Sequence, residues 1–136
     1  MRPVVADASA FVEYLLRTSR AGLVEWVIES PEVDLHAPAL CDVEVVSALR
    51  RALRTGLLME ARASLALDAY LDLPLARHGH AGLMTRALAL RDNFTAYDAM
   101  YVALAEGLGA ELLSADKGLV RAAGHHTDLD VIPAAV

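Results

Sequence analysis

Four carboxylates lie at positions predicted to be buried, where an apolar residue would cost less free energy of desolvation. Asp7 and Asp116 each end a short run typical of a buried strand, "PVVAD" and "AELLSAD". Glu44 and Asp98 lie early in stretches with helical periodicity and share a stripe with apolar residues. A lone desolvated carboxylate needs a cap, a cation or a metal. All-oxygen ligands favour hard cations such as Mg²⁺ or Mn²⁺ over zinc, and one or two such ions support hydrolysis at a phosphate.

Short strand-like runs alternate along the chain with amphipathic stretches, which predicts an α/β fold with a mainly parallel sheet flanked by helices. The 136 residues are expected to form a single domain, 1–136. Strands are predicted at 3–7, 33–38, 73–76, 110–115 and 129–133. Helices are predicted from residue 7 or 9 to 17, and at 21–30, 39–54, 57–71, 80–91, 93–109 and 116–124. Because the carboxyl ends of parallel strands share one edge, where ligands bind, Asp7 and Asp116 are expected to meet there.

Each acid also has a simpler explanation. Asp7 and Asp116 could cap the helices that follow them, and Asp98 could close a capping box with Thr95. Glu44 could pair with an arginine. Convergence of all four acids would instead set like charges against one another, which a cation would offset. Caps and a cation site therefore both remain open from the residues alone.

Other chemistries have weaker support. The chain has no G-x-S-x-G elbow, P-loop or G-x-G-x-x-G, and Ser9 stands where a haloacid-dehalogenase-type phosphatase has its second Asp. Cys41 is expected to be a small buried hydrophobe. Histidines in predicted loops are interpreted as surface residues rather than zinc ligands: His78, His80, His125 and His126. Aromatic residues are expected to pack rather than stack on bases: Phe94, Tyr97 and Tyr101.

Charge gives a mixed indication of the partner. The net charge of −6 argues against indiscriminate nucleic-acid binding. Three arginines nevertheless cluster in "LRRALRTG": Arg50, Arg51 and Arg54. Arginine favours bidentate contacts with phosphate, so these residues are candidates for substrate binding, although a solvated helix face explains them equally well.

The location follows from what the chain lacks. No uncharged apolar run approaches the roughly 20 residues of a membrane span. Asp7 comes too early for a secretory signal, and a single cysteine fits a reducing compartment. A cytoplasmic protein without a membrane partner is expected.

Four segments resemble the signature segments of PIN-domain nucleases, and more narrowly those of the VapC toxins of VapBC toxin–antitoxin pairs: "VVADASAFVEYLL", "APALCDVEVVSALRR", "NFTAYDAMYVALAE" and "LLSADKGLV". The resemblance covers essentially the whole chain, in the family's order and length. Carried over residue by residue, the family's acidic quartet falls on Asp7, Glu44, Asp98 and Asp116. Ser114 occupies the position where the family has Thr or Ser. Residues 57–90 lie where the family varies, so substrate choice does not carry over.

The resemblance implies a Mg²⁺- or Mn²⁺-dependent endoribonuclease that acts as a growth-inhibiting toxin. It also implies a homodimer inhibited by a VapB-like antitoxin, whose C-terminal segment covers the active site. Asp7 and Asp98 are assigned the direct metal contacts, and Glu44 and Asp116 complete the shell or orient water, with Ser114 bonded within it. The alternatives are a DNA nuclease or phosphatase with the same metal site, and a non-catalytic protein-binding domain.

Overall fold

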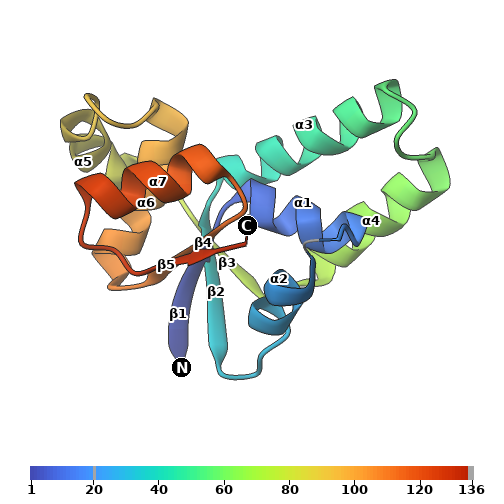
Figure 1. Ribbon diagram of the computed structural model, residues 1–136, viewed down its shortest axis with the longest axis horizontal. Helices are drawn as coiled ribbons and strands as arrows, with labels where there is room; N and C mark the ends of the chain where they lie inside the picture. The colour runs from blue at the N-terminus through green and yellow to red at the C-terminus, as the bar shows by residue number, and fades with distance from the viewer. Residues whose placement is uncertain (20, 135–136) are drawn as a thin grey trace.

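Short parallel strands form the centre of the protein in the computed structural model, which describes residues 1–19 and 21–134 (Figure 1). The strands are β1 (Arg2–Ala6), β2 (Val33–Pro38), β3 (Leu75–His78), β4 (Glu111–Ser114) and β5 (Val131–Pro133). The helices are α1 (Ala8–Leu16), α2 (Ala21–Ile28), α3 (Leu40–Arg54), α4 (Glu60–Asp72), α5 (Met84–Ala89), α6 (Ala96–Leu108) and α7 (Lys117–His126), with a 3₁₀ turn at Ala81–Leu83. The predicted α/β class with a parallel sheet is confirmed.

The order of the strands in the sheet is β3-β2-β1-β4-β5. From β1 the chain moves outward through β2 to β3, then returns to the other side of β1 to form β4 and β5. Right-handed crossovers in opposite directions place their helices on opposite faces. Helices α1 and α2 accordingly pack on one face, whereas α6 packs across β1, β2 and β4 on the other. The strand order reverses between β1 and β4, and this reversal is where open α/β sheets bind ligands.

Burial explains why β1 is the central strand. Val4, Val5 and Ala6 are fully buried because helices cover both faces of the sheet. A strand buried on both faces is a continuous apolar run rather than an alternating one. β1 therefore delivers the residue that follows it, Asp7, to the centre of the edge formed by the carboxyl ends of the strands.

Several boundaries differ from those predicted: α2 ends at Ile28 rather than 30, α6 begins at Ala96 rather than 93, and β3 is Leu75–His78 rather than 73–76. Residues 57–59 connect α3 to α4 outside any helix, and the predicted helix at 80–91 is a 3₁₀ turn followed by the shorter α5. α7 continues through Gly124 to His126. Glycine inside a helix costs only about 1 kcal/mol relative to alanine, and the Thr127 hydroxyl and amide both bond to the carbonyl of Ala123, closing the last turn.

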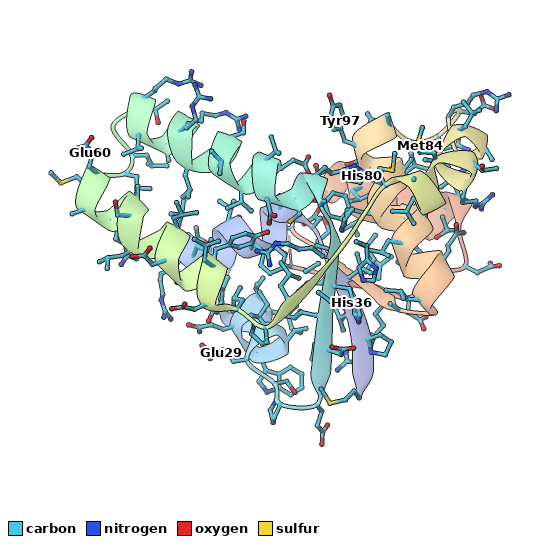
Figure 2. The ribbon with its side chains drawn as sticks, turned by 180° about the vertical axis from the view of Figure 1, so that it is seen from behind. Glu29, His36, Glu60, His80, Met84 and Tyr97 are labelled. Atoms are coloured by element: carbon cyan, nitrogen blue, oxygen red, sulfur yellow. The ribbon has the colours of Figure 1, made fainter. Side chains whose placement is uncertain are left out.

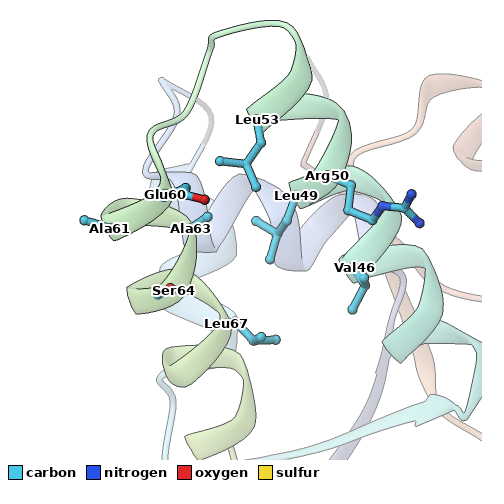
Figure 3. Close-up of a pocket in the computed structure, with 9 residues that line it drawn as sticks. All are labelled: Val46, Leu49, Arg50, Leu53, Glu60, Ala61, Ala63, Ser64 and Leu67. Atoms are coloured by element: carbon cyan, nitrogen blue, oxygen red, sulfur yellow. The ribbon is translucent and has the colours of Figure 1, made fainter.

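Helices α3 and α4 form a pair that extends away from the sheet (Figure 1). A groove of about 590 Å³ lies between them, and Figure 3 shows Leu49, Leu53 and Leu67 lining it. Within the described residues, no helix is long and apolar enough to cross a membrane.

Candidate active site

Asp7 follows β1 directly and caps α1, with only 5% of its surface exposed. Its Oδ1 accepts hydrogen bonds from the Ser9 hydroxyl at 2.6 Å and the Ala10 amide at 3.0 Å, and its Oδ2 accepts one from the Ser114 hydroxyl at 2.6 Å. Among the described residues, Asp7 is the buried charged residue and Ser114 is the buried serine or threonine. Because all three partners donate, the geometry suits an ionised carboxylate.

The two serines also connect Asp7 to the far part of the chain. Ser9 Oγ accepts a hydrogen bond from the Ala115 amide at 3.0 Å, and Ser114 Oγ accepts one from the Asp116 amide at 3.0 Å. Each hydroxyl thus accepts a hydrogen bond from a backbone amide of the loop after β4 and donates one to the Asp7 carboxylate. This arrangement fixes the loop that carries Asp116 beside Asp7. The sequence pattern did not single out Ser9 as a site residue; its position two residues after Asp7, in the first turn of a helix, was the available signal.

Asp116 caps α7, as the simpler explanation proposed. Its Oδ1 accepts from the amides of Gly118 at 2.8 Å and Leu119 at 3.1 Å. Its Oδ2 has no hydrogen-bond partner within the described part of the chain, and the residue is exposed. Capping therefore occupies one oxygen of Asp116 and leaves the other available to a ligand.

Glu44 and Asp98 reach the same region from two helices. Glu44, half-buried on α3, pairs with no arginine among residues 1–19 and 21–134: its Oε1 accepts a hydrogen bond from the Tyr101 hydroxyl at 2.6 Å. Asp98 is the third residue of α6, and its amide donates to the Thr95 hydroxyl at 3.1 Å, so Thr95 caps the helix. The sequence had suggested only packing for Tyr101, and it is indeed buried.

The pKa shifts show that the four acids lie within electrostatic reach of one another. Burial, with a small contribution from the charge of Asp116, raises the pKa of Asp7 to about 6 against the lowering effect of the two serine hydroxyls. Burial also raises the pKa of Asp98, to which the Asp116 charge adds. Burial likewise raises the pKa of Glu44, to which the Asp98 charge adds. The acids therefore form a continuous series of mutually repelling carboxylates: Asp7, Asp116, Asp98 and Glu44.

The chemistry of these donors fits a divalent cation. They are carboxylate oxygens whose negative charges oppose one another, and a hard cation would offset that repulsion. Within residues 1–19 and 21–134, no three side chains among His, Cys, Asp and Glu already surround a common position suited to an ion. The less constrained acids, Glu44 and Asp98, would therefore have to move toward the ion on binding.

Two candidate groups lie apart from this chemistry. Cys41 is buried, and burial raises the pKa of its thiol to about 11, so it stays protonated and is the small hydrophobe expected. Arg50, Arg51 and Arg54 are exposed on the second half of α3, six to ten residues beyond Glu44. At 1.5 Å per residue they lie about 9–15 Å further along the helix axis, so they do not converge with the acids.

The histidines divide into two groups. His125 and His126 are exposed as expected, but they lie in the last turn of α7 rather than in a loop. His78 and His80 are only partly exposed, and His78 is the last residue of β3 rather than part of a loop. His78 Nε2 lies 2.9 Å from His36 Nδ1, and His80 Nε2 accepts a hydrogen bond from the Leu40 amide at 2.9 Å. His80 thereby supplies the N-terminal cap of α3, whose own capping residue, an alanine, has no side-chain acceptor.

Of the three aromatic residues expected to pack, Tyr97 does not. It is 66% exposed at the start of α6 and points away from the body of the protein (Figure 2), whereas Phe94 is buried as expected. A tyrosine next to Asp98 with an exposed ring has the surface needed to contact a ligand that approaches the acidic edge.

Comparison with known proteins identifies the fold and its chemistry. Residues 4–125 match the PIN domain, a span that includes all four acids and Ser114. The chain belongs to the PIN-domain family. It is 43% identical over 120 residues to ribonuclease VapC3 of Mycobacterium tuberculosis, an alignment covering 88% of this chain and 86% of VapC3. It is 36% identical over 129 residues to ribonuclease VapC12 of the same organism, covering 95% and 98% of the two chains.

The structural likeness extends over the whole PIN domain. A chain in the crystal structure of VapBC2 from Rickettsia felis, bound to a promoter DNA fragment, superimposes with a TM-score of 0.66 at 12% identity, covering 96% of this chain and 98% of that one. This likeness shows the fold, and the curated relatives show the activity class. The protein is a PIN-domain ribonuclease of the VapC toxin group.

Proposed function

We propose that this ribonuclease is the toxin of a type II toxin–antitoxin pair and that it hydrolyses phosphodiester bonds within RNA, using Mg²⁺ held by Asp7, Glu44, Asp98 and Asp116. Mn²⁺ serves in place of Mg²⁺. The whole chain, 1–136, acts as one PIN domain in the cytoplasm, where its RNA substrates are. The observation that supports this most strongly is the buried carboxylate of Asp7, fixed by three donors at the reversal of strand order.

Each acid has a distinct part in the proposed mechanism. Asp7 and Asp98 would hold the ion, and the two serine bonds keep Asp7 ionised and fixed in orientation. Glu44 would orient the attacking water and accept its proton, and Asp116 would offer the ion the oxygen that does not cap α7. When bound, the divalent ion supplies Lewis-acid stabilisation of the charge that develops on the phosphate.

Selectivity for RNA has to come from binding, because nothing in this hydrolysis uses the 2′-hydroxyl. The exposed arginines of α3 lie about 9–15 Å along the helix from Glu44, within reach of phosphates flanking the cleaved bond. We assign Arg50, Arg51 and Arg54 to those phosphates, because guanidinium groups bind phosphate oxygens in pairs. The exposed ring of Tyr97 offers a surface on which a nucleobase near the cleaved bond can stack.

Cleavage assays with three substrates test the proposal. Protein freed of antitoxin is incubated with labelled structured RNA, single-stranded DNA and a phosphomonoester, each with Mg²⁺, with Mn²⁺ and with excess EDTA. We expect RNA to be cut internally with either ion and to remain intact with EDTA. Equal cleavage in EDTA would refute the metal mechanism. Preferential hydrolysis of DNA or of the monoester would instead support one of the two alternative activities.

The same proposal includes two protein partners. Exposed apolar side chains often mark interfaces, and Met84 and Leu88, both on α5, support a homodimer. Figure 2 shows where Met84 lies. The apolar groove between α3 and α4 fits an amphipathic segment of a VapB-like antitoxin (Figure 3). An arginine from that segment would then reach the acidic edge and neutralise it.

A charge placed in the groove tests the antitoxin site. Leu67 lines the groove, whereas Leu65, on the same helix, does not. We expect Leu67→Glu to weaken antitoxin binding by at least about tenfold, since a carboxylate would be desolvated there, while Leu65→Glu binds normally. Isothermal titration measures the affinity and light scattering the mass of the complex. Equal binding by the two variants, or a monomeric toxin inert to the antitoxin encoded beside it, would contradict the proposed partners.

A further inference from the structure

Tyr101 joins the two helices that carry Glu44 and Asp98. Its side chain is 1% exposed, and its hydroxyl donates to Glu44 Oε1 at 2.6 Å. Tyr101 lies on α6 about one turn after Asp98, whereas Glu44 lies on α3. A separation of 2.6 Å is typical of a hydroxyl bonded to an ionised carboxylate. The hydrogen bond therefore fixes the acid of one helix against the helix that carries another.

Glu44 depends on this one bond, whereas Asp7 and Asp116 each have more than one donor. Asp7 receives three donors and Asp116 receives two backbone amides. Within the described chain, the Tyr101 hydroxyl is the single hydrogen-bond donor to the Glu44 carboxylate. Glutamate has a long side chain with several rotamers to lose on ordering, and the charge of Asp98 opposes its ionised form. Without the hydroxyl, Glu44 would be free to turn toward water.

We propose that Tyr101 is a positioning residue of the active site, whose hydroxyl holds the Glu44 carboxylate ready for the divalent ion and the attacking water. This inference rests on the function proposed above. Tyr101 acts through Glu44, because a residue that is 1% exposed cannot itself contact RNA. Partners that orient a metal-binding side chain in this way affect metal affinity and activity by about 10- to 100-fold when removed.

Tyr70 provides a matched control. It is also 1% exposed, and its hydroxyl donates at 2.7 Å to Asp42, another carboxylate of α3 that is not among the four acids. The hydroxyls of Tyr70 and Tyr101 both lie beside the thiol of Cys41. Tyr70→Phe and Tyr101→Phe therefore each remove one oxygen from a buried phenol bonded to the same helix. Only the Tyr101 change reaches the acidic site.

The test measures Mg²⁺ affinity and RNA cleavage in the full chain. Mg²⁺ affinity is obtained from the rise in melting temperature as the ion is titrated, a readout that needs no activity. For Tyr101→Phe we expect both Mg²⁺ affinity and cleavage rate to fall about tenfold, which corresponds to about 1.4 kcal/mol. For Tyr70→Phe we expect both to stay within about twofold of the unmodified protein.

A double-mutant cycle separates positioning from a general structural role. If Tyr101 acts through Glu44, then Tyr101→Phe added to Glu44→Gln should cause no further loss of Mg²⁺ affinity. An additive loss, equal effects of the two Phe variants, or a Tyr101→Phe protein that fails to fold while Tyr70→Phe folds would each overturn the proposal.

The two readouts also separate this inference from the proposed function. If the unmodified protein gains stability with Mg²⁺ but cuts no RNA, the proposed function fails while the Mg²⁺ titration still decides the role of Tyr101. If Mg²⁺ causes no shift in the unmodified protein, both proposals are overturned.

Discussion

Neutralising any one of the four acids is expected to lower the rate of RNA cleavage by about 10²-fold or more, the loss that follows when several kcal/mol of charge stabilisation is removed. The variants are Asp7→Asn, Glu44→Gln, Asp98→Asn and Asp116→Asn. Amides keep the size of the side chain but lose the negative charge that holds a cation. Growth inhibition should fall together with cleavage, measured on protein freed of antitoxin.

The choice of amides separates the metal site from helix capping. Asn caps a helix about as well as Asp, so Asp116→Asn keeps the bond to the Gly118 amide that the structure shows. If Asp116 served only as a cap, the variant would cut RNA normally. Asp68→Asn, on the exposed face of α4, is the control and should leave cleavage unchanged. Near-normal cleavage by all four site variants would mean that the acids are caps and that the proposed mechanism is wrong.

Asp7→Asn is also expected to make the metal-free protein more stable at neutral pH, with an effect that nearly vanishes at pH 3.5. Burial raises the pKa of Asp7 from 3.8 to about 6 in the folded protein. Below pH 3.8 the group is protonated in both states and costs nothing. As the pH rises from about 4 to 6, the unfolded chain ionises first, so the folded state loses stability. Above about pH 6 the loss is constant, at about 3 kcal/mol for a shift of about two units.

The measurement compares metal-free melting temperatures of Asp7→Asn and the unmodified protein at pH 3.5 and pH 7.5. The substitution replaces one carboxylate oxygen of Asp7 that accepts from Ser9, Ala10 or Ser114, and the cost of that lost acceptor is nearly the same at both pH values. The change with pH in the difference between the two melting temperatures therefore isolates the effect of the charge. Addition of Mg²⁺ at pH 7.5 should reverse the order, because only the ionised Asp7 gains from the ion. A stability difference that does not change with pH would show that burial of Asp7 is not costly.

The sequence by itself determined the classes of secondary structure and singled out the four acids as candidates for the site. The apolar run before Asp7 and the run before Asp116 are local patterns with the period of a buried strand, and each acid follows one of them. The helical stripes that contain Glu44 and Asp98 are equally local. The resemblance to the PIN family depended on the same segments, and the match over residues 4–125 confirmed it. Local periodicity was less informative near 57–59, where the leucines that suggested an early start of α4 lie outside the helix.

Only the tertiary structure decided which groups hold the acids in place. The Ser114 hydroxyl reaches Asp7 across 107 positions of sequence, and Tyr101 reaches Glu44 across 57. Both bonds depend on strand order and helix packing: β4 returns beside β1, and α6 packs on β2, the strand that leads into α3. Periodicity indicates which face of an element is buried, but not which distant element covers it. The donors that orient each carboxylate therefore emerge only when the strands are ordered in space.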